Sequence, residues 1–136
     1  MLTTETKIRI RFGETDKMSF VYYGNYALYY EQARTEMMRY LGLSYKEMEK
    51  KGTVMPVLEM HTKYLKPAFY DDLIIIKTFL RQMPTARIRF DYEIYNEKTD
   101  LLNKGYTVLT FANAKTLKPV RPPKYFLDSL APYFDK

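Results

Sequence analysis

The residues in this chain whose types and spacing could carry out chemistry lie between positions 11 and 26, in the segment RFGETDKMSFVYYGNY. Asp16 follows a short basic strand pattern and precedes an aromatic-rich stretch that reads as the start of a helix. An ionised aspartate can deprotonate a water or attack a carbonyl carbon directly. The free N–H groups of a first helical turn are suited to stabilising the oxyanion that forms. The arrangement predicts acyl transfer from an activated ester or thioester. The alternative is that Asp16 only forms an Asx turn or a helix cap.

Other catalytic arrangements are excluded by the residues that the chain lacks. It has no cysteine, so it has no thiolate nucleophile and no cysteine-based metal site. Its one histidine, His61, falls on a strand pattern between Glu59 and Lys63, which is typical of a solvated strand face. There is no GxSxG elbow and no glycine-rich phosphate loop. We therefore expect no metal and no separate cofactor.

Composition and charge narrow the class of partner. The chain has 136 residues, a net charge of +6 and a pI near 9.3, and its basic residues are scattered. This favours a small anionic partner or an acidic carrier protein over nucleic acid. No apolar run reaches the roughly 20 residues of a membrane span, and the N-terminus has no apolar signal region. We expect a cytoplasmic protein.

Periodicity predicts the elements that position Asp16. Lys7–Phe12 alternates as a half-buried strand, with Ile8, Ile10 and Phe12 on one face, and Gly13 ends it. Helical spacing of apolar residues follows over Asn25–Leu41. The apolar positions are Tyr26, Tyr29, Tyr30, Ala33, Met37, Tyr40 and Leu41.

Caps and turns define the rest of the chain. Asn25 or a residue just before it is expected to cap the long helix, and Gly42 to end it. A capping box at Ser44–Glu47 predicts a short helix to about Lys51. Strand patterns and a last short helix follow, at Val54–Leu65, Leu73–Met83, Arg87–Tyr95, Leu102–Ala114 and Lys124–Leu130.

This order of elements predicts an α+β fold. Strands that follow one long helix indicate an antiparallel sheet with the helix on one face, in a single domain over 1–136. One helix covers only part of a five-stranded sheet. The remaining edges and aromatic surface predict self-association.

Two segments resemble a known family, the hotdog-fold thioesterases of the 4-hydroxybenzoyl-CoA thioesterase type. The family includes the short acyl-CoA thioesterases encoded near the Tol–Pal envelope genes. Its motif D-T-D-x-x-G-x-V-Y-[HY]-x-x-Y, followed by an E-x-A-R helix, is similar to ETDKMSFVYYGNY at 14–26 and EQAR at 31–34. YLKPAFYDD at 64–72 is similar to a strand-to-strand turn of the family.

The resemblance implies a fold, an activity and an assembly. The fold is one hotdog domain, a five-stranded antiparallel sheet wrapped around one long helix. The activity is hydrolysis of a thioester of CoA or, alternatively, of acyl carrier protein. The assembly is a homodimer or homotetramer, and CoA enters only as part of the substrate.

The resemblance also assigns roles to residues of this chain. Asp16 is the general base or nucleophile, and the backbone N–H of Tyr23 polarises the thioester carbonyl. Basic residues near subunit boundaries hold the CoA phosphates, and the candidates are Lys66, Arg87 and Arg89. The candidates for walls of the acyl pocket, with core residues as the alternative interpretation, are Phe20, Tyr22 and Tyr30.

Some residues depart from the family pattern. Ser19 stands where glycine is usual and Met18 replaces another small residue, which could narrow the entrance or tilt the loop of Asp16. Glu14 in place of aspartate is interpreted as a loop-shaping residue. Glu31, spaced to pair with Arg34, is the reserve candidate for the catalytic carboxylate, because some other hotdog thioesterases place theirs on this helix.

Two alternatives stay open. The first is a protein that keeps the fold and binds acyl-CoA or acyl carrier protein without turnover. The second is a basic nucleic-acid module, which would bind with a steep salt dependence. The identity of the acyl group is not predicted.

Overall fold

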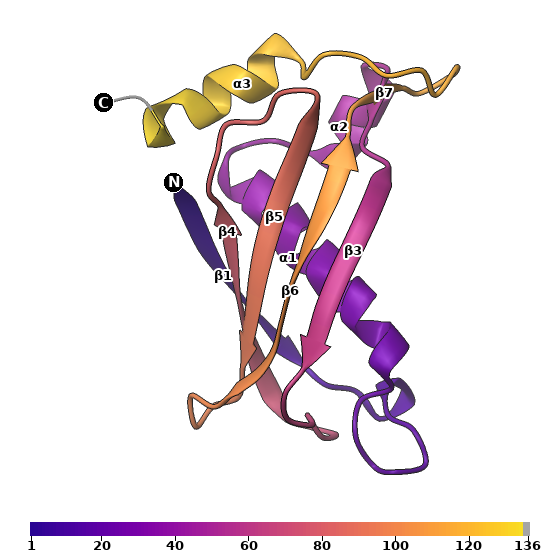
Figure 1. Ribbon diagram of the computed structural model, residues 1–136, viewed down its shortest axis with the longest axis vertical. Coiled ribbons are helices and arrows are strands. Elements are labelled where there is room, and N and C mark those ends of the chain that lie inside the picture. The colour runs from indigo at the N-terminus through magenta and orange to yellow at the C-terminus, as the bar shows by residue number, and fades with distance from the viewer. Residues whose placement is uncertain (135–136) are drawn as a thin grey trace.

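The computed structural model describes residues 1–134 and contains a five-stranded antiparallel sheet with one long helix along one face (Figure 1). The strands follow the order β1 (Leu2–Arg9), β4 (Leu73–Leu80), β5 (Arg87–Tyr95), β6 (Leu101–Thr110) and β3 (Val57–Tyr64). The helix is α1 (Tyr26–Tyr40). The predicted α+β fold, with its antiparallel sheet, is confirmed. β1 and β3 form the two edges, so β3 has one neighbour in the sheet.

Short elements connect these strands and the helix. A 3₁₀ turn, η1, follows β1, and a second, η2, leads into α1. A two-stranded ribbon of β2 and β7 lies beside α2, and α3 covers the end of the sheet near the β4–β5 hairpin (Figure 1). Their bounds are η1 Phe12–Glu14, η2 Tyr23–Asn25, α2 Tyr45–Lys50, β2 Thr53–Val54, β7 Ala112–Asn113, α3 Lys124–Leu130 and η3 Ala131–Tyr133. None of the helices within 1–134 combines the length and apolar character that a bilayer crossing requires.

The core lies between α1 and the inner face of the sheet. Every second residue of β5 is buried there, as the alternation predicts. The predicted apolar face of α1 is buried as far as Met37, whereas Tyr40 is 64% exposed. The buried residues on the two sides are Tyr26, Tyr29, Tyr30, Ala33, Met37 and Met38 from α1, and Ile88, Phe90, Tyr92 and Ile94 from β5.

The first strand was predicted too late in the chain. β1 pairs with β4 from Leu2 to Arg9, because the threonine-rich N-terminus continues the ladder. After Arg9, the N–H of Ile10 donates to Asp72 O at 2.9 Å, and the chain then turns into η1. Phe12 is therefore 75% exposed instead of sharing the buried face with Ile10.

Turn chemistry was predicted more accurately than strand length. Gly42 and Gly52 have φ of 79° and 99°, and the Ser44 side chain accepts the Glu47 N–H at 3.2 Å. The predicted strand Val54–Leu65 is interrupted at Pro56, which has no N–H for the ladder. Leu102–Ala114 is likewise divided at Phe111 into β6 and β7.

Gly105 leaves room on β6 for the β3 main chain and for the Tyr30 hydroxyl. A Cβ at this position would lie 2.2 Å from the His61 carbonyl oxygen and 2.6 Å from the Tyr30 hydroxyl. We expect Gly105→Ala to lower the free energy of unfolding by about 2–3 kcal/mol, because main chain of the neighbouring strand must move. Urea denaturation measures this. The control is Gly13→Ala, since nothing lies within 4 Å of a Cβ there. Equal stability of the two variants would contradict the prediction.

Candidate active site

The loop that carries Asp16 is a tight hairpin anchored to the β3–β4 connection. The Asp16 N–H donates to Phe20 O at 3.0 Å, and the Ser19 N–H donates back to Asp16 O at 3.0 Å. The Val21 N–H donates to Ala68 O at 2.8 Å, which ties the hairpin to the neighbouring connection. Ser19 has a φ of 72°, the left-handed region that glycine occupies most easily. Ser19 therefore holds a backbone conformation that is costly for a residue with a Cβ, and the hairpin hydrogen bonds keep it there.

The Asp16 carboxylate is only partly used by the loop. Its Oδ1 accepts the Met18 N–H at 2.8 Å, so the Asx turn considered from sequence is present. No hydrogen bond or ion pair within residues 1–134 engages Oδ2. Asp16 is half-buried and lines a cavity of about 290 Å³. One carboxylate oxygen thus fixes the loop, and the other is free to act in the cavity.

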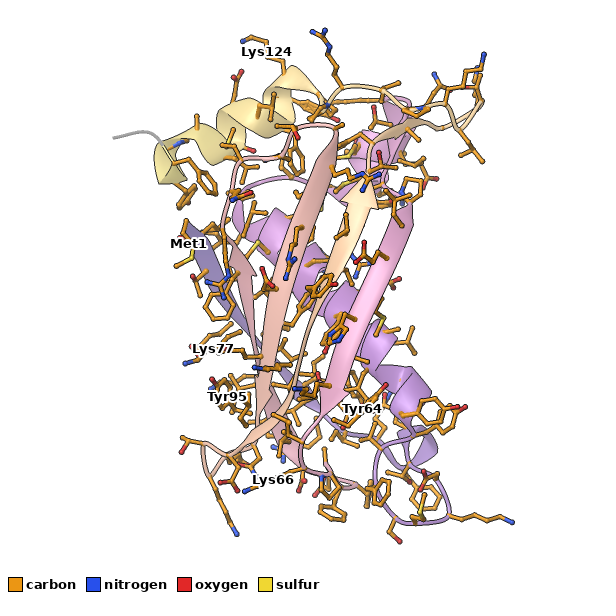
Figure 2. All side chains as sticks on the ribbon, in the orientation of Figure 1. Met1, Tyr64, Lys66, Lys77, Tyr95 and Lys124 are labelled. Carbon is orange, nitrogen blue, oxygen red and sulfur yellow. The ribbon has the colours of Figure 1, made fainter. Side chains whose placement is uncertain are left out.

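The cavity is mostly apolar and aromatic. It lies at the end of the sheet where α1 begins, and the labelled Tyr64 and Lys66 mark its position in Figure 2. The Tyr64 ring packs edge-on against Tyr26 and Tyr23, with ring centroids 5.3 and 6.4 Å away. The other lining residues are Asp16, Met18, Phe20, Val21, Leu65, Lys66 and Pro67.

Tyr26, the buried tyrosine of this cavity, remains neutral. Burial, and secondly the proximity of Tyr64, raises the pKa of Tyr26 to about 12. The Tyr64 hydroxyl donates to Tyr23 O at 3.3 Å. The Tyr64 side chain therefore holds the η2 turn in place, and Tyr26 adds no charge that would compete with Asp16.

The start of α1 provides candidate oxyanion donors. The Asn25 N–H closes η2 by donating to Tyr22 O at 3.0 Å. In the part of the chain that the structure describes, the N–H groups of Tyr23 and Gly24 donate to no acceptor. Asn25 does not cap the helix with its side chain, which was one of the sequence expectations. Its Nδ2 donates instead to the Glu14 main-chain oxygen at 2.8 Å, because the preceding loop folds back onto η2.

Only some of the predicted site residues meet at the cavity. Asp16, Tyr23, Phe20 and Lys66 all line it. Tyr22, although adjacent to Tyr23, points elsewhere and is 46% exposed.

Tyr30 lies in the core instead of at the cavity. Its hydroxyl bonds to Thr62 Oγ1 at 2.9 Å and also contacts Asn103, and its ring stacks on Tyr92 with centroids 4.2 Å apart. This position agrees with the alternative interpretation from sequence, in which Tyr30 is a core residue.

Arg87 and Arg89 lie on β5, at the end of the sheet opposite to the Asp16 loop. β5 begins at the β4–β5 hairpin with Arg87, whereas the Asp16 loop lies at the opposite end of the sheet (Figure 1). Both arginines line a pocket of about 470 Å³ beside that hairpin. Within one chain they are therefore not part of the Asp16 cavity.

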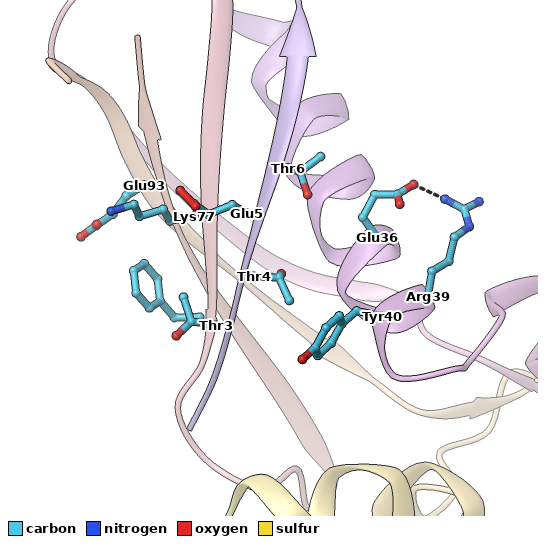
Figure 3. A pocket seen from close by; sticks show the side chains of 10 residues that line it. Thr3, Thr4, Glu5, Thr6, Glu36, Arg39, Tyr40, Lys77 and Glu93 are labelled. Atoms are coloured by element: carbon cyan, nitrogen blue, oxygen red, sulfur yellow. Dashed lines mark hydrogen bonds and ion pairs between the residues drawn. The ribbon is translucent and has the colours of Figure 1, made fainter. Parts of the chain in front are cut away.

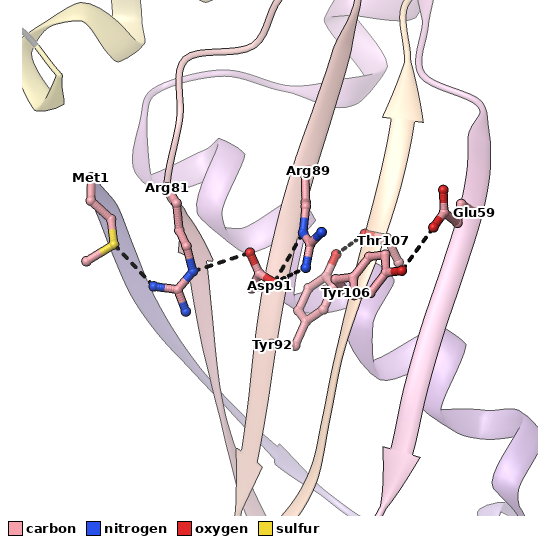
Figure 4. A network of polar contacts seen from close by, with 8 residues as sticks. All are labelled: Met1, Glu59, Arg81, Arg89, Asp91, Tyr92, Tyr106 and Thr107. Carbon is pink, nitrogen blue, oxygen red and sulfur yellow. Dashed lines mark hydrogen bonds and ion pairs between the residues drawn. The ribbon is translucent and has the colours of Figure 1, made fainter.

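The two arginines differ in what they bind. On the sheet face that α1 leaves uncovered, Arg89 and Arg81 both contact Asp91, and the Arg89 guanidinium lies 3.8 Å from the Tyr106 ring centroid (Figure 4). Among the described residues Arg87 has no ion pair. Arg87 is therefore the arginine of this pair that is free to bind an external anion.

Glu31, the reserve carboxylate, faces another groove. It is exposed and lines a space of about 510 Å³ with Arg34. No ion pair joins the two side chains within 1–134, so their predicted intrahelical pairing is wrong. The Arg34 guanidinium instead lies close enough to Tyr92 to oppose the rise in its pKa that burial causes.

A larger groove between β1 and α1 does not have the features of the Asp16 cavity. It measures about 870 Å³, and Glu36 in its wall is paired with Arg39 (Figure 3). Its α1 residues belong to the C-terminal half of the helix, where the free main-chain groups are carbonyls and not N–H donors. This groove therefore cannot supply an oxyanion hole from α1.

A family model described as the thioesterase-like superfamily matches residues 10–130. The chain belongs to this superfamily. A "Putative acyl-CoA thioesterase YneP" of Bacillus subtilis is 31% identical to this thioesterase, over 94% of this chain and 93% of its own. An "Acyl-CoA thioester hydrolase YbgC" of Escherichia coli O157:H7 is 30% identical, over 86% and 87%.

A solved structure resembles the thioesterase more closely. The DHNA-CoA thioesterase of Staphylococcus aureus is 39% identical, covers 98% of this chain and 89% of its own, and superposes with a TM-score of 0.91. The predicted hotdog thioesterase family is confirmed, as is the predicted class of enzyme, a thioester hydrolase.

Sequence reasoning missed part of the cavity wall. Tyr26 was placed only on the buried face of the helix, and Tyr64 only on a predicted strand and in a turn motif. Tyr64 comes from β3 and Tyr26 from α1, so spacing within one element could not bring them together. The sequence feature that could have indicated both residues as cavity walls is their aromatic character.

Proposed function

We propose that this thioesterase hydrolyses an acyl-CoA, with Asp16 as general base or nucleophile and the N–H groups at Tyr23 and Gly24 as the oxyanion hole. The observation that carries the proposal is the free Oδ2 of Asp16 beside a cavity that Tyr23 also lines. The names of the relatives in B. subtilis and E. coli support a CoA thioester as substrate.

The chemistry follows from this arrangement. Asp16 takes a proton from a water that attacks the thioester carbon, or attacks that carbon itself to form an anhydride that water then opens. In either route the carbonyl oxygen gains negative charge, which the two N–H groups stabilise. The C–S bond breaks, the thiolate of CoA leaves and takes up a proton, and the carboxylic acid is released.

The cavity is sized for the acyl group and not for the nucleotide. About 290 Å³ bounded by Phe20, Tyr26 and Tyr64 accommodates an apolar or aryl acyl chain. The pantetheine arm and the phosphates of CoA must then lie outside the cavity. Lys66, which lines the cavity and lies 3.7 Å from Asp100, is the cation beside that opening.

A homodimer through β3 completes the site. β3 is an edge strand with exposed apolar side chains, and Leu58 is 51% exposed. Such an edge is a template for pairing with another strand. Antiparallel pairing of β3 with the same strand of a second copy places the β4–β5 hairpin of one protomer beside the Asp16 end of the other.

This pairing gives Arg87 a role that it cannot have within one chain. With strands about 4.8 Å apart, β5 of one protomer lies roughly 14 Å from β3 of the other. An extended pantetheine arm can bridge this gap between Asp16 of one protomer and Arg87 of its partner. Arg87, which has no ion pair within residues 1–134, would then bind the CoA phosphates, and Arg89, which Asp91 holds, would lie beside it.

A thiol-release screen tests the proposed function. The panel contains acyl-CoAs of increasing chain length and aryl-CoAs, because a relative at 39% identity is named a DHNA-CoA thioesterase. We expect turnover of at least one acyl-CoA. If calorimetry instead shows binding of a non-hydrolysable acyl-CoA and no panel member is hydrolysed, the protein is the non-catalytic binder.

The same screen addresses the acyl carrier protein. An acyl-carrier-protein thioester presents the same pantetheine arm without the CoA nucleotide. Turnover of the carrier-bound substrate at lower concentration than the CoA ester would assign the carrier protein as the partner. The cytoplasmic location stays a prediction.

A further inference from the structure

We infer that Glu14 and Tyr29 are positioning residues, which hold the Asp16 loop and the η2 turn in a fixed relation. This inference rests on the proposed function and concerns groups that do not line the Asp16 cavity. Glu14 lies two residues before Asp16, and Tyr29 lies one turn into α1.

The Glu14 carboxylate joins the end of β1 to the long helix. Its Oε1 accepts the Arg11 main-chain N–H and the Tyr29 hydroxyl, both at 2.9 Å. Its Oε2 accepts the Arg11 guanidinium at 3.0 Å. Tyr29 is buried in α1, so its hydroxyl is a fixed point to which the loop is attached.

The main-chain oxygen of Glu14 joins the same loop to the oxyanion donors. It accepts the Tyr22 N–H at 2.9 Å and the Asn25 side-chain amide at 2.8 Å. Tyr23 and Gly24 lie between these two partners in the sequence. One residue thus fixes both the segment that carries Asp16 and the turn that carries the free N–H groups.

The surroundings of Glu14 and Tyr29 keep the carboxylate ionised and the hydroxyl protonated, so that the hydrogen bond between them persists. Burial opposes ionisation of Glu14, but hydrogen bonds from Arg11 and Tyr29, with the charge of Arg11, lower its pKa below 4.5. Burial and the bond to Glu14 raise the pKa of Tyr29, so its hydroxyl remains a donor. The contact is complete at neutral pH and is lost only as acid protonates Glu14.

The consequence for catalysis is geometric. Asp16 and the oxyanion donors must face one carbonyl group at once, and a displacement of about 1 Å can cost roughly 100-fold in rate. Loss of the Glu14–Tyr29 bond leaves the acyl walls of Tyr26 and Tyr64 in place, because these residues belong to α1 and β3 and not to the Asp16 loop. The defect therefore falls on kcat and not on KM.

Two variants test the inference by steady-state kinetics. We expect Tyr29→Phe and Glu14→Gln each to lower kcat by about 10–100-fold, with KM changed by less than about 3-fold. Because both act through one contact, the double variant should lose no more than the larger single loss. Circular dichroism and thermal unfolding establish that each variant folds.

Matched controls lie elsewhere in the chain. Glu36→Gln removes an i,i+3 pair with Arg39 that resembles the pair of Glu14 with Arg11. Tyr95→Phe removes a hydroxyl that donates to Glu93 at 2.7 Å, as Tyr29 donates to Glu14. Both controls should keep kcat within about 2-fold, as surface changes away from the site do.

The outcomes separate the inference from the proposed function. Unchanged kcat in both folded variants, or a rise in KM alone, would overturn the positioning role. If Glu14→Gln fails to fold, Tyr29→Phe decides, because it keeps the ring and removes only the hydroxyl. Asp16→Asn, assayed in parallel, tests the proposed function. If Asp16→Asn loses turnover and the Glu14 and Tyr29 variants do not, only the positioning role is wrong. If Asp16→Asn retains turnover, Asp16 is not the catalytic carboxylate.

Discussion

Asp16→Asn is expected to lower thiol release from an acyl-CoA by about 10²–10⁴-fold, the effect of losing a general base or nucleophile. The amide keeps an oxygen that can accept the Met18 N–H, so the Asx turn and the hairpin survive. What the variant loses is the charge and basicity of the second carboxylate oxygen. Initial rates with a thiol reagent, at substrate concentrations above and below KM, measure the loss.

The control for this experiment is another loop aspartate. Asp72 Oδ2 accepts the Phe69 N–H at 2.8 Å, as Asp16 accepts Met18, but Asp72 does not line the cavity. Asp72→Asn should therefore retain turnover within about 2-fold. Near-wild-type turnover by Asp16→Asn, with unchanged circular dichroism, would remove Asp16 from the mechanism.

Arg87→Ala is expected to raise KM for acyl-CoA about ten-fold or more and to change kcat little. A hydrogen bond to a charged group contributes about 1.5–3 kcal/mol, and the phosphates lie away from the reacting carbonyl. A short pantetheine thioester without the nucleotide should show no such change in KM. Arg121→Ala, at an exposed arginine near α3, is the control.

A mixed dimer shows whether Arg87 acts across the subunit contact. A dimer of one Asp16→Asn protomer and one Arg87→Ala protomer contains one intact site if Asp16 and Arg87 of different protomers cooperate. Such a dimer should recover about half of the wild-type rate at low substrate, because one of its two sites is intact. If both residues served the same protomer, the mixed dimer would show only the high KM of the Arg87 variant.

Local patterns predicted what depends on local physics. The helix over Tyr26–Tyr40 follows from its apolar spacing, and the reversals at Gly42 and Gly52 from the freedom of glycine at positive φ. The Asx turn at Asp16 was likewise readable, because Asp favours such turns.

Long-range contacts determine which aromatic side chains line the cavity, and the sequence did not predict this. Tyr22 and Tyr23 are neighbours in a tyrosine-rich run, and only the fold of η2 decides that Tyr23 lines the cavity. Tyr30 is one turn after Tyr26 on the same helix. Its hydroxyl nevertheless bonds to Thr62 on β3, which directs it into the core.

The position of Arg87 likewise could not be predicted from residue spacing. Residue spacing predicts that it lies on a strand, but not that it lies at the end of the sheet opposite to Asp16. Antiparallel pairing in the order β4–β5–β6 puts Arg87 at the hairpin end of the sheet. Its link to the active site therefore depends on a second protomer, which a single chain does not contain.

A crystal structure of the Asp16→Asn variant with intact acyl-CoA tests the central geometric claim most directly. The predicted result is a thioester carbonyl oxygen about 2.7–3.1 Å from the Tyr23 or Gly24 nitrogen, with the side chain at position 16 facing the carbonyl carbon. An acyl group bound in the groove between β1 and α1, or a carbonyl turned away from η2, would contradict it.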